Sequence, residues 1–358
     1  MSLRFQSLAA ILLIIGSIWP QFSHASSESL RIALMPPGHY EIITGTNRWT
    51  VYLDGVIESG ADTRLAKELS HIPNSPINVY FNSPGGDFLT GMKLGRLLRT
   101  KAAWTHIGKY NPKEKLPESG ECFSACALAY LGGYYRFGAK GSSYGVHRTW
   151  KDGGSADSDL DVGQIISAAT SAYIREMGVD GGLLDLIVSA GKSEIYLLSD
   201  AQQKTLKITN GGRASAEWSL QLIQGLYYLR GVQNTMYGQG KFLLYCTKQE
   251  LMLHSIYEVG PDKSEAISKG GWFHFLLIDG GAIPLPNPSR TSDDHGYLNS
   301  AFVLTPEQIR RVLTARESVG HAMQLSRDAP TFVGYKVDLN DASSKQLREF
   351  VSTCSTKK

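Results

Sequence analysis

The sequence predicts an α/β protein in which strands alternate with helices, followed by a smaller strand-rich C-terminal region. Runs rich in β-branched and aromatic residues, such as RWTVYLDGVI at 48–57 and PINVYF at 76–81, alternate with segments whose apolar residues recur at helical spacing. The stretch TNGGRAS at 209–215 has the composition of a linker, and strand patterns predominate after it. Alternation of this kind favours parallel βαβ units with right-handed connections.

The alternating elements occupy residues 26–210. The helix predicted over 88–100 is expected to turn Leu89, Met92, Leu97 and Leu98 inward. The polar segment that follows the last of the early strands, at 109–119, is predicted to be a loop. Further strands are predicted at 30–36, 48–57, 76–81 and 102–108, and further helices at 61–72, 161–178 and within 196–208.

Residues 216–358 are predicted to form a strand-rich C-terminal domain, to which the sequence assigns no role. A helix is expected to begin at Thr305, because Thr is a favoured N-cap and Pro306 suits the first helical position. A second helix is expected near the C-terminal end, at 343–354. The predicted strands lie at 240–246, 250–259, 271–285 and 331–339.

The composition is that of an ordinary globular protein. Of the 358 residues, 42% are hydrophobic and 19% are charged, and the formal net charge is +3. Lys and Arg are scattered without a basic run, so we expect no nucleic-acid partner.

The N-terminus has the layout of a secretory signal peptide. A basic start is followed by the short apolar run at 8–19, and the small residues Ser23 and Ala25 precede the expected cleavage site. We therefore expect residues 1–25 to be removed and the mature protein to be periplasmic or secreted. In such a compartment disulfides persist.

Four cysteines remain after the predicted cleavage, and they permit three connectivities. Nearness in the sequence favours Cys122 with Cys126 and Cys246 with Cys354. Cysteines four residues apart on a regular helix would have Cα atoms ~6 Å apart, within disulfide range.

Ser124 lies in the stretch GECFSACALAYLGG at 120–133, where it opens a run of small and apolar residues. Serine is a favoured helix N-cap, so one interpretation of Ser124 is structural. The other is a nucleophile, because unpaired N–H groups and the helix dipole at a helix start favour negative charge. On the second interpretation the amide of Ala125 would stabilise an oxyanion.

A second oxyanion donor is expected in the segment NSPGGD at 82–87. Two glycines at the end of a strand let the backbone turn and approach a substrate closely. The amide of Gly86, or alternatively that of Gly85, is the predicted donor. The competing interpretation of this segment is a plain Pro-Gly turn.

A general base and an orienting acid complete the predicted site. His147 lies at the end of a predicted strand, 23 residues after Ser124, and its imidazole suits proton transfer near neutral pH. Glu194 is the first candidate for the acid, Asp185 the second and Asp200 the third.

These residues together resemble the catalytic subunit of Clp protease and, more broadly, the ClpP/crotonase fold. The resemblance rests on NSPGG at 82–86, Thr90–Gly91, the Ser124 turn, Arg136–Phe137 with His147 ten residues on, and EIYLLS at 194–199. It spans residues 48–210. It implies stacked βαβ units, a Ser124–His147–Glu194 triad, oxyanion amides from Gly86 and Ala125, and rings of subunits.

The chain also departs from the family pattern. The family acid is Asp rather than Glu, and the cysteines that flank Ser124 are not a family feature. The segment at 109–119 is inserted before the nucleophile turn. An exported protein has no ATP supply and the sequence contains no P-loop, so we expect no ATPase partner.

The expected function is therefore an exported, ATP-independent serine peptidase that uses no cofactor and no metal. Its partners would be peptide or protein substrates and further copies of itself. A Ser–Lys variant would use Lys140 as the base. The alternatives are a catalytically degenerate ClpP-fold protein that binds peptides or partner proteins, and a crotonase-type acyl-CoA enzyme, which export disfavours.

Overall fold

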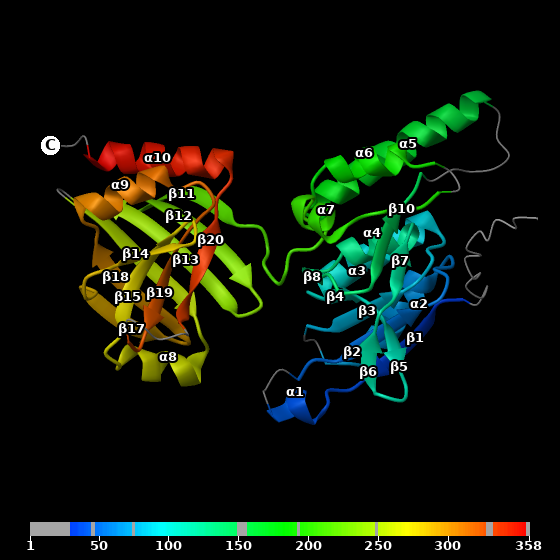
Figure 1. The fold of residues 1–358 in the computed structure, drawn as a ribbon, viewed down its shortest axis with the longest axis horizontal. Helices are drawn as coiled ribbons and strands as arrows, with labels where there is room; N and C mark the ends of the chain where they lie inside the picture. Colours follow the sequence, from blue (N-terminus) through cyan, green and yellow to red (C-terminus); the bar gives the residue numbers. More distant parts are fainter. Residues whose placement is uncertain are drawn as a thin grey trace, which may run out of the picture.

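The computed structural model describes residues 29–43, 47–73, 76–148, 156–191, 194–247, 250–326 and 332–355. The predicted signal peptide, residues 1–25, lies outside the described residues. The described chain is a mixed α/β structure with several sheets (Figure 1).

A five-stranded sheet organises the N-terminal part of the chain. Its strand order is β1-β2-β3-β4-β8; β1 is antiparallel to β2, and the other neighbours are parallel. The inward side chains of β2 and β3, among them Leu53 and Phe81, are fully buried, as expected of parallel strands covered by helices. The strands are β1 (Arg31–Met35), β2 (Thr50–Asp54), β3 (Asn78–Asn82), β4 (Trp104–Ile107) and β8 (Tyr135–Phe137).

Helices connect these strands as the alternating pattern predicts. Helix α3 has the predicted bounds, and its N-cap is Asp87, whose carboxylate accepts a hydrogen bond from the Thr90 amide at 2.8 Å. The predicted inward direction of Leu89 is wrong: its side chain is 58% exposed, because it shares a helical face with Lys93 and Arg96. The helices of this part are α1 (His39–Ile43), α2 (Ala61–Leu69), α3 (Phe88–Thr100), α4 (Ala125–Leu131), α5 (Ala156–Glu176), α6 (Gly182–Ser189) and α7 (Asp200–Thr205).

A smaller sheet and a hairpin lie beside the five-stranded sheet. The small sheet has the order β10-β9-β7, with β7 parallel to β9. The segment at 109–119, predicted to be a loop, instead forms the hairpin β5–β6, in which Lys109 faces Glu118 across the strands. Its charged residues hid the strand pattern because both strands are only three residues long. The strands are β5 (Lys109–Asn111), β6 (Leu116–Glu118), β7 (Glu121–Phe123), β9 (Ser143–Val146) and β10 (Tyr196–Leu197).

The C-terminal part contains a six-stranded sheet of order β11-β12-β13-β14-β18-β17 and a four-stranded sheet of order β16-β15-β19-β20. The predicted helix start is confirmed, since Thr305 forms a capping box with Gln308 and Pro306 begins the helix. The strands are β11 (Glu217–Ile223), β12 (Leu226–Thr235), β13 (Gly238–Cys246), β14 (Leu251–Glu258), β15 (Phe273–Ile278), β16 (Gly281–Pro284), β17 (Arg290–Asp294), β18 (Tyr297–Val303), β19 (Ser318–Gln324) and β20 (Val333–Asp338). The helices are α8 (Pro261–Ser268), α9 (Pro306–Thr314) and α10 (Asp341–Ser355).

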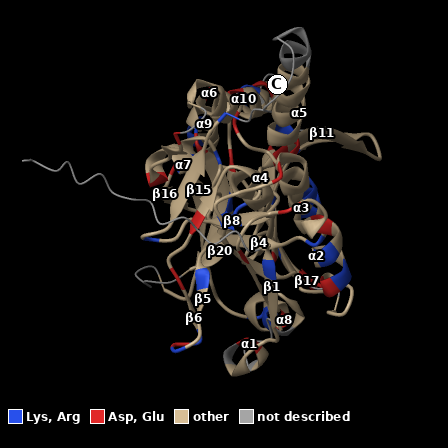
Figure 2. Cartoon of the chain, turned by 90° about the vertical axis from the view of Figure 1, so that its right-hand side faces the viewer, with Lys and Arg blue, Asp and Glu red and all other residues tan. Residues whose placement is uncertain are grey.

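The described apolar side chains form two separate hydrophobic clusters. One runs from Leu30 to Ile208 and the other from Leu229 to Val351. Polar contacts join the two parts; the Asn234 amide, for example, donates to the Tyr134 hydroxyl at 2.8 Å. In Figure 2 the β11–β12 hairpin projects from the body of the chain.

Candidate active site

Ser124 occupies a sharp turn between a strand and a helix. Strand β7 ends at Phe123 and helix α4 begins at Ala125. The backbone of Ser124 has φ 57° and ψ −122°, a conformation that L-residues rarely adopt, and its side chain makes no capping hydrogen bond. The structure therefore does not use Ser124 as an ordinary N-cap. Strained backbone of this kind is concentrated at functional sites.

Backbone contacts on both sides hold this turn in place. The Ser124 amide donates to the Gly145 carbonyl of β9 at 3.1 Å, and its carbonyl accepts from Leu128 at 3.4 Å. Cys122 on β7 and Cys126 on α4 lie on either side of the turn with Cα atoms 5.2 Å apart, at the distance of a disulfide. Cys246 and Cys354 form a second pair at 5.6 Å. Both pairs are those that nearness in the sequence favours.

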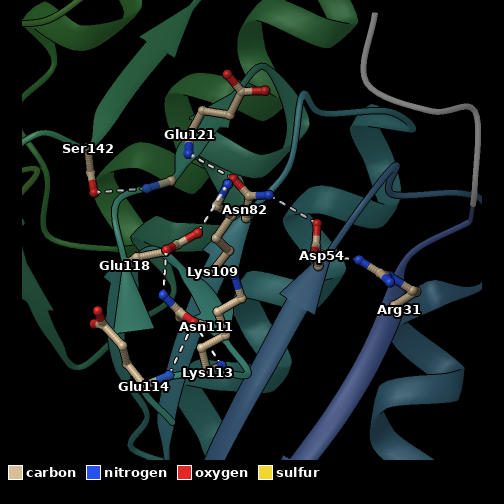
Figure 3. Close-up of polar contacts among 11 residues, drawn as sticks. Arg31, Asp54, Asn82, Lys109, Asn111, Lys113, Glu114, Glu118, Glu121 and Ser142 are labelled. Atoms are coloured by element: carbon tan, nitrogen blue, oxygen red, sulfur yellow. Dashed lines mark hydrogen bonds and ion pairs between the residues drawn. The ribbon is translucent and has the colours of Figure 1, made fainter. Parts of the chain in front are cut away.

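The end of β3 is tied to β7, and this places the glycine segment beside Ser124. The Ser83 amide donates to the Glu121 carbonyl at 2.7 Å, and the Phe123 amide donates to the Ser83 carbonyl at 3.1 Å. Asn82 adds a side-chain link, because its Oδ1 accepts from the Glu121 amide at 3.1 Å (Figure 3).

Asn82 belongs to a polar chain that sequence analysis did not identify. Its Nδ2 donates to Asp54 at 3.0 Å, and Asp54 in turn pairs with Arg31 at 2.7 Å (Figure 3). The chain thus connects β1, β2 and β3 to β7. A polar residue at the carboxyl end of a parallel strand is the signal that could have pointed to it.

Gly85 approaches the nucleophile turn so closely that no side chain fits. A Cβ added to Gly85, whose φ is 111°, would lie 2.6 Å from the Ser124 Cβ and 2.7 Å from the Phe123 carbonyl oxygen. The Gly85 amide donates to Ser83 Oγ at 3.1 Å, so it is already engaged. The Gly86 amide has no acceptor within the described parts of the chain, and Gly86 is exposed. Of the two predicted donors, the structure thus leaves the Gly86 amide available.

His147 directly follows strand β9, which lies parallel to β7, and this brings it close to Ser124. The two side chains line one small hollow together with Phe88, Leu128, Val146 and Ile187. The His147 Nδ1 contacts the Arg148 carbonyl oxygen at 3.2 Å. The predicted nucleophile and the predicted base therefore face the same hollow, whose other walls are apolar.

The three candidate acids lie on the exposed surface. Glu194 precedes β10, which pairs antiparallel with β9 so that Tyr196 faces Val146. Asp185 lies on α6 and Asp200 begins α7. Among the described residues, these three carboxylates make no hydrogen bond or ion pair. Glu194 is the one whose strand neighbours the strand that leads to His147.

Two arginines fix the far end of the helix that begins at Ser124. Arg99 and Arg136 donate to the carbonyls of Leu131 and Gly133, which the end of α4 leaves unpaired. Burial, together with the neighbouring charge of Arg99, lowers the pKa of Arg136 to about 10. Arg136 belongs to the Arg-Phe pair of the resemblance, but its contacts are structural.

No metal site or membrane-spanning helix is found in the part of the chain that the structure describes. No group of three or more His, Cys, Asp or Glu side chains is placed to hold a metal ion there. No described helix combines the length and the apolar character needed to cross a bilayer.

The comparisons with known proteins give structural similarity alone. No family model matches the chain, and no curated protein sequence matches it. Its structure is similar to those of ClpP-type proteases. ClpP1 from Listeria monocytogenes is 18% identical, with a TM-score of 0.35 over 45% of this chain and 88% of that one. A mutant of the same ClpP1 is 19% identical, with a TM-score of 0.36 over 48% and 94%. A mutant of the 1510-N membrane-bound stomatin-specific protease is 16% identical, with a TM-score of 0.33 over 44% and 75%.

Proposed function

We propose that this chain is a serine hydrolase that cleaves peptides, with Ser124 as the nucleophile and His147 as the general base. One observation carries the proposal. Ser124 is held at φ 57° without a capping bond, and it lines the same small hollow as His147. A plain helix cap would need neither the strained backbone nor the neighbouring imidazole.

The proposed reaction proceeds in two steps. The Ser124 Oγ forms a bond to the carbonyl carbon of a peptide while His147 accepts the hydroxyl proton. The C–N bond then breaks, and the proton passes from His147 to the departing amine. Water, activated by His147, releases the acyl group from Ser124 and completes the hydrolysis.

The oxyanion that forms in each step needs hydrogen-bond donors. The Gly86 amide and the first amide of α4, at Ala125, are the proposed pair, because Gly86 is exposed and unpaired among the described contacts and helix-start amides lack intrahelical partners. Loss of one such donor typically costs ~3 kcal/mol of transition-state stabilisation.

Glu194 is proposed as the residue that orients His147. It lies two residues before β10, the strand that pairs with the one leading to His147. Its exposed carboxylate would have to turn toward the imidazole on substrate binding. Glu194→Gln should then slow acylation of Ser124. The corresponding carboxylate-to-amide changes, Asp185→Asn and Asp200→Asn, should leave the acylation rate unchanged.

The proposed setting is outside the cytoplasm. We propose export after removal of residues 1–25, and hydrolysis without ATP. The two cysteine pairs at disulfide distance support this setting, because disulfides persist in oxidising compartments. The proposed substrates are accessible or unfolded polypeptides, and self-association is proposed as a further property.

The test is covalent labelling of residues 26–358 with a fluorophosphonate probe, followed by peptide mapping. We expect an adduct on Ser124 that is absent in Ser124→Ala and nearly absent in His147→Ala, since triad members act as a unit. Ser119→Ala, a change of an exposed serine near the same turn, serves as the matched control and should label normally.

Peptide hydrolysis by Ser124→Ala at the original rate would eliminate this mechanism. Absence of an adduct in a protein shown to be folded by circular dichroism would instead favour a catalytically inactive protein that binds peptides.

A further inference from the structure

A groove in the C-terminal part runs beside strand β20. It has a volume of about 700 Å³. Its walls come from four segments that are distant in the sequence: the linker at 211–213, the β12–β13 turn, the end of β14 with the helix α8 that follows it, and residues 332–336 at the start of β20. The Ser124 hollow shares no lining residue with it.

Strand β20 is an edge strand of the four-stranded sheet. The Leu339 amide donates to the Glu317 carbonyl at 2.8 Å, so odd-numbered residues of this strand present their backbone groups to β19. The even-numbered residues consequently present theirs to the open edge. An edge of this kind is a template for pairing with another strand.

Side chains from the rest of the chain cover only the last part of this edge. The Asp338 amide donates to Gln233 at 2.9 Å, and Arg213 donates to the Lys336 carbonyl at 3.3 Å. Within the described residues, the Gly334 amide and carbonyl and the Lys336 amide have no partner. These three groups border the groove and match the hydrogen-bonding period of an extended peptide.

The groove is positively charged. Its charged lining residues are Arg213, Lys263 and Lys336, with no Asp or Glu among them. Arg213 is paired with Asp338, which leaves the two lysines without an ion pair in the described structure. An acidic ligand would complement them.

Aromatic side chains supply the apolar part of the groove. Tyr237 at the β12–β13 turn is 75% exposed, and Tyr257 and Tyr335 form the floor. A large aromatic ring left in solvent beside an unpaired strand edge is typical of a recognition surface.

A buried hydrogen-bond chain holds the groove wall rigid. The Tyr335 hydroxyl donates to the Lys241 carbonyl at 2.6 Å and contacts Ser255 Oγ at 3.0 Å. Ser255 contacts His321 at 2.8 Å, and His321 contacts His274 at 3.0 Å. A strand edge fixed in advance loses little entropy when a ligand pairs with it.

We infer that this groove binds an extended acidic peptide segment, which adds as a strand to the open edge of β20. Backbone hydrogen bonds to Gly334 and Lys336 would supply affinity, and the ammonium groups of Lys263 and Lys336 would select acidic side chains. The inference concerns binding in the C-terminal part and does not require Ser124 to be a nucleophile.

The test uses the Ser124→Ala form of residues 26–358, so that cleavage cannot interfere. The probe is a fluorescein-labelled octapeptide of alternating Val and Glu, and binding is followed by fluorescence anisotropy. We expect binding about tenfold tighter than that of the matching Val–Lys octapeptide. Equal affinity for the two octapeptides would overturn the acidic selectivity.

Strand addition is tested with two N-methylated forms of the Val–Glu probe. One carries the methyl groups on the Val amides and the other on the Glu amides, so only one of them can keep its N–H groups toward β20. We expect one form to lose binding and the other to keep it. Equal loss or equal retention would overturn pairing with the edge.

Charge reversal locates the site. Lys263→Glu/Lys336→Glu should weaken binding of the Val–Glu probe about tenfold and favour the Val–Lys probe. The matched control, Lys93→Glu/Lys345→Glu, changes two exposed lysines outside the groove and should bind as the parent does. Equal effects of the two pairs would mean a general charge effect and would overturn the site.

Discussion

At the scale of single residues, the candidate site depends on a contact that leaves no room for a side chain. Gly85 lies against the Ser124 turn, where an added Cβ would meet the Ser124 Cβ at 2.6 Å. Neither backbone can retreat easily, because the Gly85 carbonyl accepts from the Ile57 amide at 2.8 Å and Ser124 donates to Gly145. Close packing therefore transmits any change at Gly85 directly to the nucleophile.

Gly85→Ala should reduce the rate of fluorophosphonate labelling of Ser124 by about tenfold or more, because a displacement of the turn costs over ~1.4 kcal/mol of activation free energy. Gly60→Ala is the matched control. Gly60 also has a positive φ, 86°, but an added Cβ there would meet nothing within 4 Å. The Gly60→Ala variant should lose ~1 kcal/mol of stability, and its Ser124 should be labelled at the parental rate. Normal labelling of Gly85→Ala would contradict the proposed geometry.

The buried histidines predict a pH dependence of stability. Burial lowers the pKa of His274 to about 4, and burial together with the neighbouring His274 lowers that of His321 to about 3. In the unfolded chain both would titrate near 6.5, so the unfolded state binds more protons below that pH. Their stabilising contribution is thus present above pH 6.5 and is lost as the pH falls toward the folded-state pKa values.

We therefore expect the free energy of unfolding of the C-terminal part to fall between pH 7 and pH 4.5, by ~2.5 kcal/mol from His321 alone. Urea denaturation at the two pH values measures this change. The double variant His274→Asn/His321→Gln should have a lower free energy of unfolding at pH 7. Its free energy of unfolding should fall less than that of the parent between pH 7 and pH 4.5. If the double variant kept the pH dependence of the parent, the loss of stability at low pH would come from groups other than these two histidines.

At the scale of elements, the cysteine pair around Ser124 joins a strand to a helix. Cys122 on β7 and Cys126 on α4 are both fully buried, with the nucleophile turn between them. A bridge over so short a loop is expected to contribute ~2 kcal/mol in the chain-entropy model. Its larger effect should be on the turn itself, because it limits how far α4 can move from β7.

Cys122→Ala/Cys126→Ala should slow the labelling of Ser124 at least about threefold, because a looser turn spends less time in the reactive geometry. Cys246→Ala/Cys354→Ala removes the other pair and should leave labelling unchanged. Equal labelling rates in both double variants would show that the first pair does not position the nucleophile.

At the scale of the whole molecule, the two hydrophobic clusters indicate two units of stability. One contains buried residues from Leu30 to Ile208 and the other from Leu229 to Val351. The contacts that join the two parts include polar ones, such as the one between Asn234 and Tyr134. Polar interfaces between parts of a chain do not usually make unfolding all-or-none.

We expect calorimetry to resolve two unfolding transitions. Cys246→Ala/Cys354→Ala opens a loop whose ends are 108 residues apart, and should lower the free energy of the C-terminal transition by ~4–5 kcal/mol in the chain-entropy model while leaving the other in place. A single transition that shifts as a whole would instead mean that the two parts unfold together.

Much of the element order could be predicted from local patterns. The bounds of α3 at 88–100, the capping box at Thr305 and the position of Ser124 before a helix all follow from side-chain periodicity and cap chemistry, which act within a few residues. The hairpin at 109–118 could not be predicted, since short charged strands carry no alternating apolar signal. Whether Leu89 is buried depends on which neighbouring elements cover that face of α3, and the local sequence pattern does not contain this information.

Local sequence patterns were thus enough to predict that a serine opens a helix, that glycines end a strand and that a histidine ends another. The positive φ of Ser124, its missing capping bond, the close approach of Gly85 and the position of His147 on the same hollow became visible in the folded chain. The same holds for the unpaired edge of β20, which no local pattern marks. The physical reason is that these features depend on strand register and on close packing between segments 20 to 60 residues apart or more, whereas sequence patterns report the preferences of neighbouring residues.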